Sequence, residues 1–248
     1  MSRATPRLRM FAGPNGSGKS TIKAVVEEAI GPDLFGVYLN ADDVEFSIRQ
    51  SRFLDISACG VKTSAEEILE FFRTSPFLAE KGLAEDAAQL VFANGKLSFQ
   101  SIEVNSYFAS VAVDFLRQKL LDSGITFTFE TVMSHRSKVE FLKLAQDKGF
   151  RTYLYYVATE DPDINVSRVE SRVAQGGHNV NRDKIVERYS RSLELLSEAV
   201  GYANRAYIFD NSSAEKVWIA EGTDGEVLEL KTDIIPHWFK IALWDKFD

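Results

Sequence analysis

The sequence predicts an α/β fold of three layers, in which helices cover both faces of a five-stranded, mostly parallel β-sheet. Short apolar runs alternate along the chain with segments of helical spacing, which is typical of folds built on a parallel sheet. A glycine-rich turn follows the first apolar run, and acidic residues follow later runs, at the strand ends where such sheets carry their sites. The chain has 248 residues, 45% of them hydrophobic, which suffices for one domain with a substantial core.

Five apolar runs are predicted to be strands because they are short and stop at polar or glycine residues. These strands are expected at 8–12, 35–39, 125–129, 152–158 and 206–209. Helical spacing between them predicts helices at 20–30, 138–147, 164–173 and 183–200. The last helix has an apolar face whose residues lie three or four positions apart, namely Ile185, Tyr189, Leu193, Leu196 and Val200.

The second and third predicted strands lie much farther apart than a simple crossover requires, since a crossover needs only about a dozen residues. Helical patterns in this stretch lie at 65–72, 83–92 and 104–121. We therefore expect a single domain, 1–248, with a helical insertion at about 51–101 between strands two and three. The C-terminal extension at about 213–248 is rich in aromatic residues near its end. We interpret these residues as docking on the core, or as a surface for self-association or a partner.

The composition excludes several classes of protein. The chain has 29 Lys and Arg against 36 Asp and Glu, a net charge of −7, so we do not expect nucleic acid as a partner. Cys59 is the only cysteine, which rules out a disulfide framework and fits a reducing compartment. No apolar segment is long enough to span a bilayer, and no signal peptide follows the basic start. We expect a cytoplasmic protein without membrane contact.

A phosphate-binding motif follows the first predicted strand. It matches G-x-x-x-x-G-K-[S/T] at every position through Gly13, Pro14, Asn15, Gly16, Ser17, Gly18, Lys19 and Ser20. Between a strand and a helix, such a loop wraps a β-phosphate with main-chain N–H groups and adds the dipole of the helix N-terminus. We expect Lys19 to neutralise β- and γ-oxygens, Ser20 to ligate Mg²⁺, and Thr21 to belong to the same nucleotide site.

The motif alone does not separate a kinase from an NTPase or a GTPase. The chain has no N-K-x-D motif for reading guanine, which argues against a GTPase, and its length argues against a large motor ATPase. The predicted fold class is therefore the P-loop NTPase or kinase fold, with ATP and Mg²⁺ as cofactors.

Carboxylates are predicted at two strand ends. A kinase needs a carboxylate beside the γ-phosphate to orient the acceptor hydroxyl and take its proton. Asp42, after the second strand, suits this role; Asp43 is its rival, and the pair can instead be first-turn acids that cap a helix. Glu130 ends the third strand, where an acid holds magnesium through water, binds the acceptor, or pairs with an arginine. Thr131 and Ser134 can add hydroxyl contacts, although turn chemistry explains them almost as well.

Arginine residues follow the fourth predicted strand. Phosphoryl transfer spreads negative charge over the equatorial oxygens, which planar guanidinium groups can stabilise. Arg168 and Arg172 lie four residues apart and so share one face of a predicted helix, while Arg188 lies on the next helix. The segment 176–178 between these helices can be the hinge of a lid, with His178 at best a lid contact, or simply a helix stop.

In this order the motifs resemble those of the zeta toxin family of kinases, particularly its short bacterial branch. The matching segments are 13–20, Asn40-Ala41-Asp42, Phe129-Glu130-Thr131, Arg168-Val169, Arg172-Val173, 176–180 and Arg188-Tyr189. The resemblance runs from Arg7 to about Ser212, except for the segment 51–101. It implies an ATP-dependent kinase that phosphorylates the 3′-hydroxyl of the sugar in UDP-N-acetylglucosamine and, in some members, an antitoxin partner.

By matching position, the resemblance makes Lys19 the phosphate lysine, Asp42 the catalytic acid, Glu130 the substrate-side acid and Arg168 the first lid arginine. The second lid arginine is expected to be Arg172 or Arg188. We assign catalysis to Lys19, Asp42, Arg168 and Arg172, and acceptor binding to Asp42, Glu130, Thr131, Ser134 and Arg188. Because the insertion lies where substrates enter such kinases, the acceptor can also be another nucleotide or metabolite.

Two other functions are consistent with the sequence. One is a nucleotide-dependent switch with slow hydrolysis, whose insertion and aromatic tail bind a protein. The other is a kinase for a polynucleotide end, which the net charge disfavours unless basic residues cluster in the insertion.

Overall fold

The computed structural model describes residues 4–176 and 180–247, and the chain in it divides into two compact units. The first unit consists of Met1–Gly36 and Thr128–Asp248, and the second is Val37–Phe127. The second unit is longer at both ends than the predicted insertion at 51–101. The expectation of a single domain stays a prediction.

The first unit is built on a sheet with the strand order β10-β9-β8-β7-β1-β6. Its strands are β1 (Arg7–Ala12), β6 (Phe127–Thr131), β7 (Arg151–Ala158), β8 (Arg205–Asp210), β9 (Val217–Thr223) and β10 (Val227–Leu230). β7 is parallel to both β1 and β8, whereas β9 is antiparallel to β8 and to β10. The strands predicted at 8–12, 152–158 and 206–209 are confirmed, and the one predicted at 125–129 begins two residues later. The C-terminal extension adds β9 and β10, so the prediction of five strands was too low.

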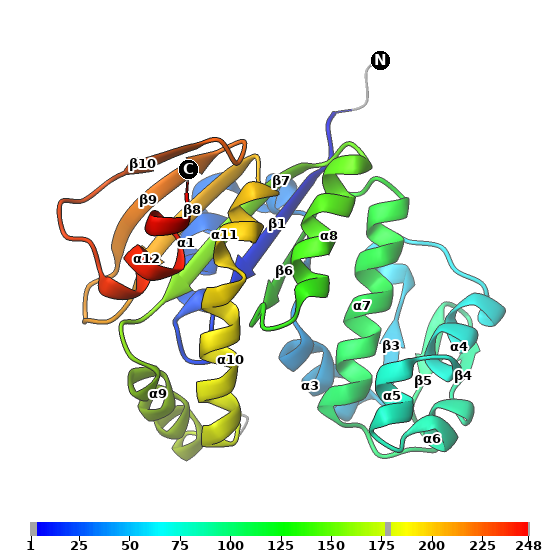
Figure 1. The fold of residues 1–248 in the computed structure, drawn as a ribbon. Coiled ribbons are helices and arrows are strands. Elements are labelled where there is room, and N and C mark those ends of the chain that lie inside the picture. Colours follow the sequence, from blue (N-terminus) through cyan, green and yellow to red (C-terminus); the bar gives the residue numbers. More distant parts are fainter. Residues whose placement is uncertain (1–3, 177–179, 248) are drawn as a thin grey trace. The chain divides into compact units, whose positions relative to one another are not determined.

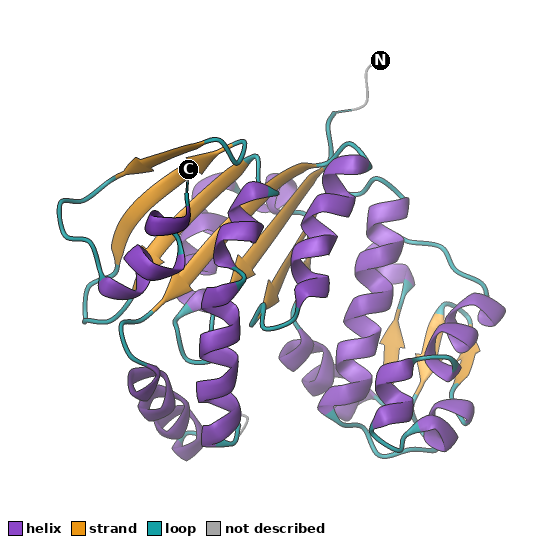
Figure 2. Ribbon diagram, in the orientation of Figure 1, coloured by secondary structure: helices purple, strands orange, loops and turns teal. Residues whose placement is uncertain are grey.

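Helices cover both faces of this sheet, as the three-layer prediction requires. The helices of the first unit are α1 (Lys19–Ile30), α2 (Pro32–Phe35), α8 (Arg136–Asp147), α9 (Pro162–Ala174), α10 (Arg182–Glu194), α11 (Leu196–Gly201) and α12 (His237–Ala242), with a 3-10 turn at Trp244–Lys246. In Figures 1 and 2, α8, α11 and α12 lie in front of the sheet and α1 lies behind it. The single helix predicted at 183–200 is instead two helices, α10 and α11, which are separated at Leu195.

Aromatic rings pack across the parallel strands of the first unit. Phe11 of β1 stacks on Tyr155 of β7 with ring centroids 4.6 Å apart, and Tyr155 stacks on Tyr207 of β8 at 5.0 Å. Neighbouring residues of parallel strands bring such side chains together on one face of a sheet. Burial raises the pKa of Tyr155 to about 12, so its ring remains neutral within this core.

The C-terminal aromatic residues dock on the first unit, in agreement with one of the two interpretations from the sequence. Trp238 and Phe239 of α12 are 4% and 0% exposed. Trp238 Nε1 donates a hydrogen bond of 2.8 Å to Oδ1 of Asp210, at the end of β8. Asp210 also accepts from the Ser212 hydroxyl at 2.6 Å, so its carboxylate supports the turn after β8 and the helix α12.

The second unit contains both helices and short strands. Its elements are β2 (Val37–Leu39), α3 (Ala41–Ser51), β3 (Phe53–Asp55), a 3-10 turn (Ser57–Cys59), α4 (Ala65–Arg73), α5 (Pro76–Glu80), α6 (Ala84–Ala88), β4 (Val91–Ala93), β5 (Lys96–Ser98) and α7 (Ser106–Asp122). The strands β3, β5 and β4 form an antiparallel sheet in that order. The helices predicted at 65–72 and 104–121 are confirmed as α4 and α7.

The prediction of a helix at 83–92 was wrong in its second half, because α6 ends at Ala88 and β4 follows. Strands of three residues are too short to give a detectable alternation of apolar and polar residues, which is why the sequence did not reveal this sheet. The core of the second unit is aromatic, and Phe72 and Phe108 each contact Phe99 edge to face.

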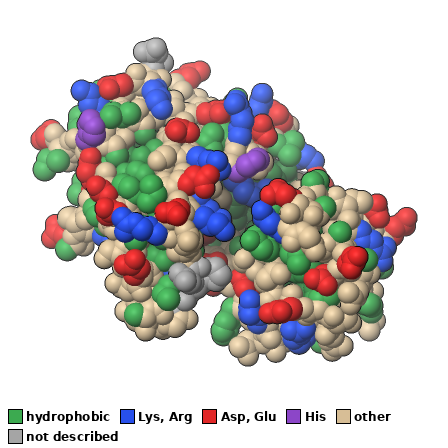
Figure 3. Space-filling view, turned by 60° about the horizontal axis from the view of Figure 1, so that its bottom comes forward, with side chains coloured by type: hydrophobic (Ala, Val, Ile, Leu, Met, Phe, Trp, Pro, Cys, Tyr) green, Lys and Arg blue, Asp and Glu red, His purple; other side chains and the backbone are tan. Residues whose placement is uncertain are grey.

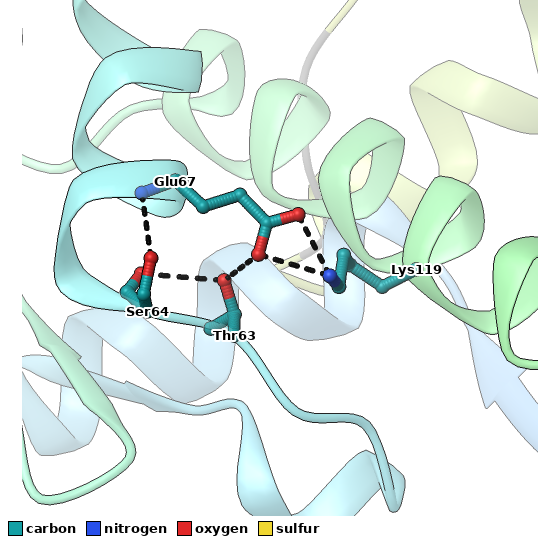
Figure 4. A network of polar contacts seen from close by, with 4 residues as sticks. All are labelled: Thr63, Ser64, Glu67 and Lys119. Carbon is teal, nitrogen blue, oxygen red and sulfur yellow. Dashed lines mark hydrogen bonds and ion pairs between the residues drawn. The ribbon is translucent and has the colours of Figure 1, made fainter.

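A polar network on the surface of the second unit joins α4 to α7 (Figure 4). The Ser64 hydroxyl caps α4 by accepting a hydrogen bond from the amide of Glu67 at 3.1 Å. The Glu67 carboxylate accepts from the Thr63 hydroxyl at 2.7 Å and from Lys119 Nζ at 2.7 and 2.9 Å. The hydrogen bond from Lys119, followed by that from Thr63, lowers the pKa of Glu67.

Charged side chains of both signs are interspersed over the face drawn in Figure 3. Over residues 4–176 and 180–247, no helix combines the length and the apolar character that crossing a membrane requires.

Candidate nucleotide-binding site

The loop between β1 and α1 accommodates only glycine at Gly13, where a Cβ atom would lie 2.0 Å from the main-chain oxygen of Val157, and at two further positions. Gly16 and Gly18 have φ angles of 75° and 96°, which L-residues with side chains rarely adopt. A Cβ atom on Gly16 would lie 2.6 Å from the main-chain oxygen of Asn165, and one on Gly18 would lie 2.3 Å from Asn211 Nδ2. Gly18 is also the N-cap of α1, so the loop leads directly into a helix N-terminus. This arrangement is suited to binding an anion.

The side chain of Lys19 folds back over the loop. Its Nζ donates hydrogen bonds to the main-chain oxygens of Gly13 at 2.9 Å and Pro14 at 2.8 Å. Charged phosphate oxygens are stronger acceptors for an ammonium group than peptide carbonyls are. Lys19 can therefore exchange these contacts for phosphate oxygens bound at the same loop.

Two buried oxygen atoms of the loop, Asn15 Oδ1 and Ser17 Oγ, have no hydrogen-bond partner within the part of the chain that the structure describes. Leaving a polar atom buried and unpaired costs about 1–3 kcal/mol, so such atoms are usually satisfied by water or a ligand. The Ser17 hydroxyl can donate to a phosphate oxygen, whereas Asn15 Oδ1 can only accept and requires a donor such as water.

Ser20 and Glu130 meet beside the loop. Ser20 lies in the first turn of α1, Glu130 is the fourth residue of β6, and Ser20 Oγ donates to Glu130 Oε2 at 3.1 Å. A hydroxyl and a carboxylate are oxygen ligands of the kind that Mg²⁺ prefers, with waters and phosphates completing its shell. The described residues include no cluster of three His, Cys, Asp or Glu side chains that could hold a metal. The Ser20 hydroxyl and the Glu130 carboxylate fit Mg²⁺ that is bound together with a nucleotide.

The hydroxyl residues after Glu130 have different surroundings. Thr131 Oγ1 accepts a hydrogen bond from the amide of Met133 at 3.1 Å, and Met133 has a φ angle of 55°. This contact makes Thr131 part of the turn after β6, which was one of the two interpretations from the sequence. Ser134 is half-buried in the same turn.

Of the three predicted lid or acceptor arginines, Arg168 contacts a residue next to the loop. Its Nη1 donates to the main-chain oxygen of Asn211 at 2.8 Å, and the side chain of Asn211 contacts the phosphate loop. Arg172, one turn farther along α9, is exposed, and Arg188 on α10 is half-buried. The predicted hinge at 176–178 lies mostly outside the described residues, which exclude 177–179 and with them His178.

The helices α9 and α10 pack against each other through a small apolar core of Val166, Val169 and Ile185. Farther along, α10 is attached to the sheet, because the Tyr189 hydroxyl donates to the main-chain oxygen of Thr159 at 2.6 Å. Burial, with the nearby Glu160 carboxylate, raises the pKa of Tyr189, so this donor keeps its proton. The helix pair is thus held next to the end of β7.

Comparison with known families shows which family the chain belongs to. The model of the zeta toxin family matches residues 93–222, just over half of the 248 residues. The chain belongs to the zeta toxin family. It is therefore a kinase-like nucleotide-binding protein, as the order of its motifs predicted.

The individual proteins that this zeta toxin family member resembles have low sequence identity to it. An uncharacterized protein of Haemophilus influenzae is 26% identical over 137 residues, which cover 53% of this chain and 89% of that protein. A structure from work on the PezAT chromosomal toxin-antitoxin system of Streptococcus pneumoniae has a TM-score of 0.52 at 16% identity, covering 100% of this chain and 82% of the other. A crystal structure of the AvrRxo1-ORF1:-ORF2 complex gives 0.51 at 14%, with coverage of 96% and 64%. These structures support the same fold.

The predicted base of this zeta toxin family chain, Asp42, lies in the second unit. It is exposed in the first turn of α3, next to the equally exposed Asp43. The cap of α3 is Asn40, whose side chain accepts a hydrogen bond from the amide of Asp42 at 2.8 Å. Neither aspartate is therefore needed to cap the helix, and the catalytic role of Asp42 stays a prediction.

Sequence reasoning missed two asparagines that contact the phosphate loop. Asn165 Nδ2 donates to the main-chain oxygen of Asn15 at 2.6 Å, and Asn211 Nδ2 donates to that of Ser17 at 2.7 Å. Asn211 directly follows β8, which was the available signal, but asparagine is so common in turns that its type carried no further information, and Asn165 lies within α9, where no local pattern marks it.

Proposed function

We propose that the protein is an ATP- and Mg²⁺-dependent kinase that transfers the γ-phosphate to a hydroxyl group of a UDP-sugar such as UDP-N-acetylglucosamine, or of another nucleotide or metabolite. The observation that carries this proposal is the contact of Ser20 with Glu130 beside a glycine loop that already holds the Lys19 ammonium group. The membership of the zeta toxin family supports the kinase class. The cytoplasm, where ATP is available, is the compartment that this function requires.

The nucleotide site of the proposal is the loop 13–21. Main-chain N–H groups and the N-terminus of α1 bind the β-phosphate, and Lys19 binds β- and γ-oxygens. Ser20 and Glu130 hold Mg²⁺, which neutralises charge on the phosphates when bound. Glu130 was expected to hold the metal or to contact the acceptor, and its hydrogen bond with Ser20 favours the metal.

In the transfer step, the acceptor hydroxyl oxygen forms a bond to the γ-phosphorus while the bond from that phosphorus to the β–γ bridging oxygen breaks. ADP leaves with the electron pair of the broken bond, and the hydroxyl proton passes to a carboxylate. We assign this proton to Asp42 on the basis of its position directly after β2 and its match to the family motif. Arg168, with Arg172 or Arg188, stabilises the charge on the equatorial oxygens. Thr131 and Ser134 contribute to acceptor binding.

A protein partner is part of the proposal. The PezAT structure comes from a toxin-antitoxin system, and the AvrRxo1 structure is a complex of two chains. We propose that an antitoxin likewise restrains this protein. Co-expression with a candidate antitoxin should give a stable complex without kinase activity, and full activity of such a complex would contradict the assignment.

The proposal is tested by incubating the purified chain with ATP, Mg²⁺ and a metabolite extract. Mass spectrometry should reveal an acceptor whose mass rises by about 80 Da, the mass of one added phosphoryl group. The Lys19→Ala variant should give no such product. Asp42→Asn should bind ATP normally and also give no product, whereas unchanged turnover would remove Asp42 from the chemistry. ATP hydrolysis without any phosphorylated metabolite would favour a nucleotide-dependent switch.

A further inference from the structure

Four main-chain oxygens of the phosphate loop accept hydrogen bonds from side chains. Lys19 contacts those of Gly13 and Pro14, and the two asparagines contact the other two. A loop that binds an anion must turn its N–H groups toward the ligand and its carbonyl groups away. Lys19 can give up its contacts to phosphate, so the two asparagines are the donors that keep carbonyl groups turned away when an anion binds, because each bond fixes the plane of one peptide group.

Asn165 supplies the donor for one side of the loop. It is fully buried in the first turn of α9, and its Nδ2 donates to the main-chain oxygen of Asn15 at 2.6 Å. The hydroxyl of Thr159, also fully buried, donates to Asn165 Oδ1. The Asn15 carbonyl oxygen can only accept, so the Asn165 amide presents its nitrogen to the loop and leaves its oxygen to accept from Thr159.

Asn211 supplies the donor for the other side and also contacts the lid arginine. It follows β8 directly, is 7% exposed, and donates from Nδ2 to the main-chain oxygen of Ser17 at 2.7 Å. Its own main-chain oxygen accepts from Arg168 at 2.8 Å. One residue therefore links the phosphate loop to the arginine that is proposed to stabilise the transferred phosphate.

We propose that Asn165 and Asn211 are positioning residues for nucleotide binding, which hold the carbonyl groups of Asn15 and Ser17 away from the triphosphate. Asn211 in addition sets the position of Arg168 relative to the loop. This inference rests on the proposed function only in requiring that ATP binds at the loop, and it does not depend on the acceptor.

The test measures the Kd for ATP with Mg²⁺ by calorimetry on the full chain. Asn165→Ala and Asn211→Ala should each raise the Kd about tenfold. Each substitution leaves one carbonyl group of the loop buried without a donor, and such a loss corresponds to a factor of about ten or more in affinity. Asn211→Asp should have a larger effect, about a hundredfold, because a carboxylate oxygen then opposes the Ser17 carbonyl group. The alanine variants test the proposal independently if the aspartate variant does not fold.

The Thr159→Val variant distinguishes a positioning role of Asn165 from a purely structural one. Thr159 contacts Asn165 and not the loop, so its loss should weaken ATP binding about threefold through the orientation of the Asn165 amide. The same substitution should have no effect on the Kd once Asn165 is alanine. An equal effect in both backgrounds would contradict the positioning role of Asn165.

Asn204→Ala is the matched control, because Asn204 directly precedes β8 just as Asn211 directly follows it. Its side chain contacts Thr152 and Asp224 at the far end of the strand. This variant is expected to lower the melting temperature and leave the Kd for ATP unchanged. If the Asn165 and Asn211 variants behave like this control, the inference is wrong while the proposed function stands. If the wild-type chain binds no ATP, the proposed function itself fails.

Discussion

The phosphate loop of the first unit and the Glu67 network of the second unit are both dense groups of polar contacts, but they differ in charge and burial. Around the loop, the asparagine donors are neutral and at most 7% exposed. In the second unit, Glu67 and Lys119 form an ion pair whose side chains are 46% and 18% exposed. Neutral buried contacts change little with pH or salt, whereas an exposed ion pair is sensitive to both. The first network is therefore suited to fixing a geometry and the second to a small gain in stability.

The largest effect should come from Gly18→Ala. A Cβ atom would lie 2.3 Å from Asn211 Nδ2, at a φ angle of 96°, so the substitution must displace the loop or the asparagine. Calorimetry should detect a loss of ATP affinity of at least about a hundredfold, corresponding to about 3 kcal/mol. Gly201→Ala is the control, because a Cβ atom there meets nothing within 4 Å. Normal ATP binding by the Gly18→Ala variant would contradict the requirement for glycine at this position of the loop.

The next effect concerns the metal. Ser20→Ala and Glu130→Gln should each raise the Mg²⁺ concentration required for half-maximal activity, by about tenfold, because each removes an oxygen ligand or its charge. The KM for the acceptor should change little. If Glu130→Gln instead raises the acceptor KM and leaves the Mg²⁺ requirement unchanged, then Glu130 contacts the acceptor, as the family resemblance implied.

A smaller effect, on stability, is expected from the hydrogen bond between Trp238 and Asp210. Trp238→Phe keeps an aromatic ring in the core but removes the hydrogen bond of 2.8 Å to Asp210. We expect the free energy of unfolding to fall by about 1–2 kcal/mol, measured by urea denaturation. Trp244→Phe, at a residue that is 38% exposed, should have little effect. If the two variants lose the same free energy of unfolding, the buried hydrogen bond of Trp238 does not contribute to stability.

The smallest effect should come from Glu67→Gln. The pKa of Glu67 is lowered by Lys119 and Thr63, so its stabilising contribution is present above the ordinary pKa of about 4.5 and is lost as pH falls through the lowered value. Because the carboxylate is nearly half exposed, we expect less than about 1 kcal/mol at neutral pH, and less in high salt. Unfolding curves of the variant and wild type should converge below the lowered pKa. A difference that is independent of pH would contradict the ion pair as its cause.

The parts of the molecule that could be predicted from the sequence are those with a local pattern of residue types. The loop 13–20 follows a strict pattern of residue types, and strands such as 152–158 are long enough for their composition to identify them. The strands β3, β4 and β5 have three residues each, and the break at Leu195 interrupts an apolar face that continues beyond it. Asn165 and Asn211 contact the loop across 150 and 194 positions of sequence, so local patterns carry no information about these partners.

The link between Ser17 and Asn211 has a consequence for biosynthesis. A ribosome makes the loop early but reaches Asn211 only 194 residues later. During most of translation the nascent chain therefore contains the phosphate motif without one of its two supports. The contact between Asn211 and Ser17 can therefore form only after β8 has been synthesised.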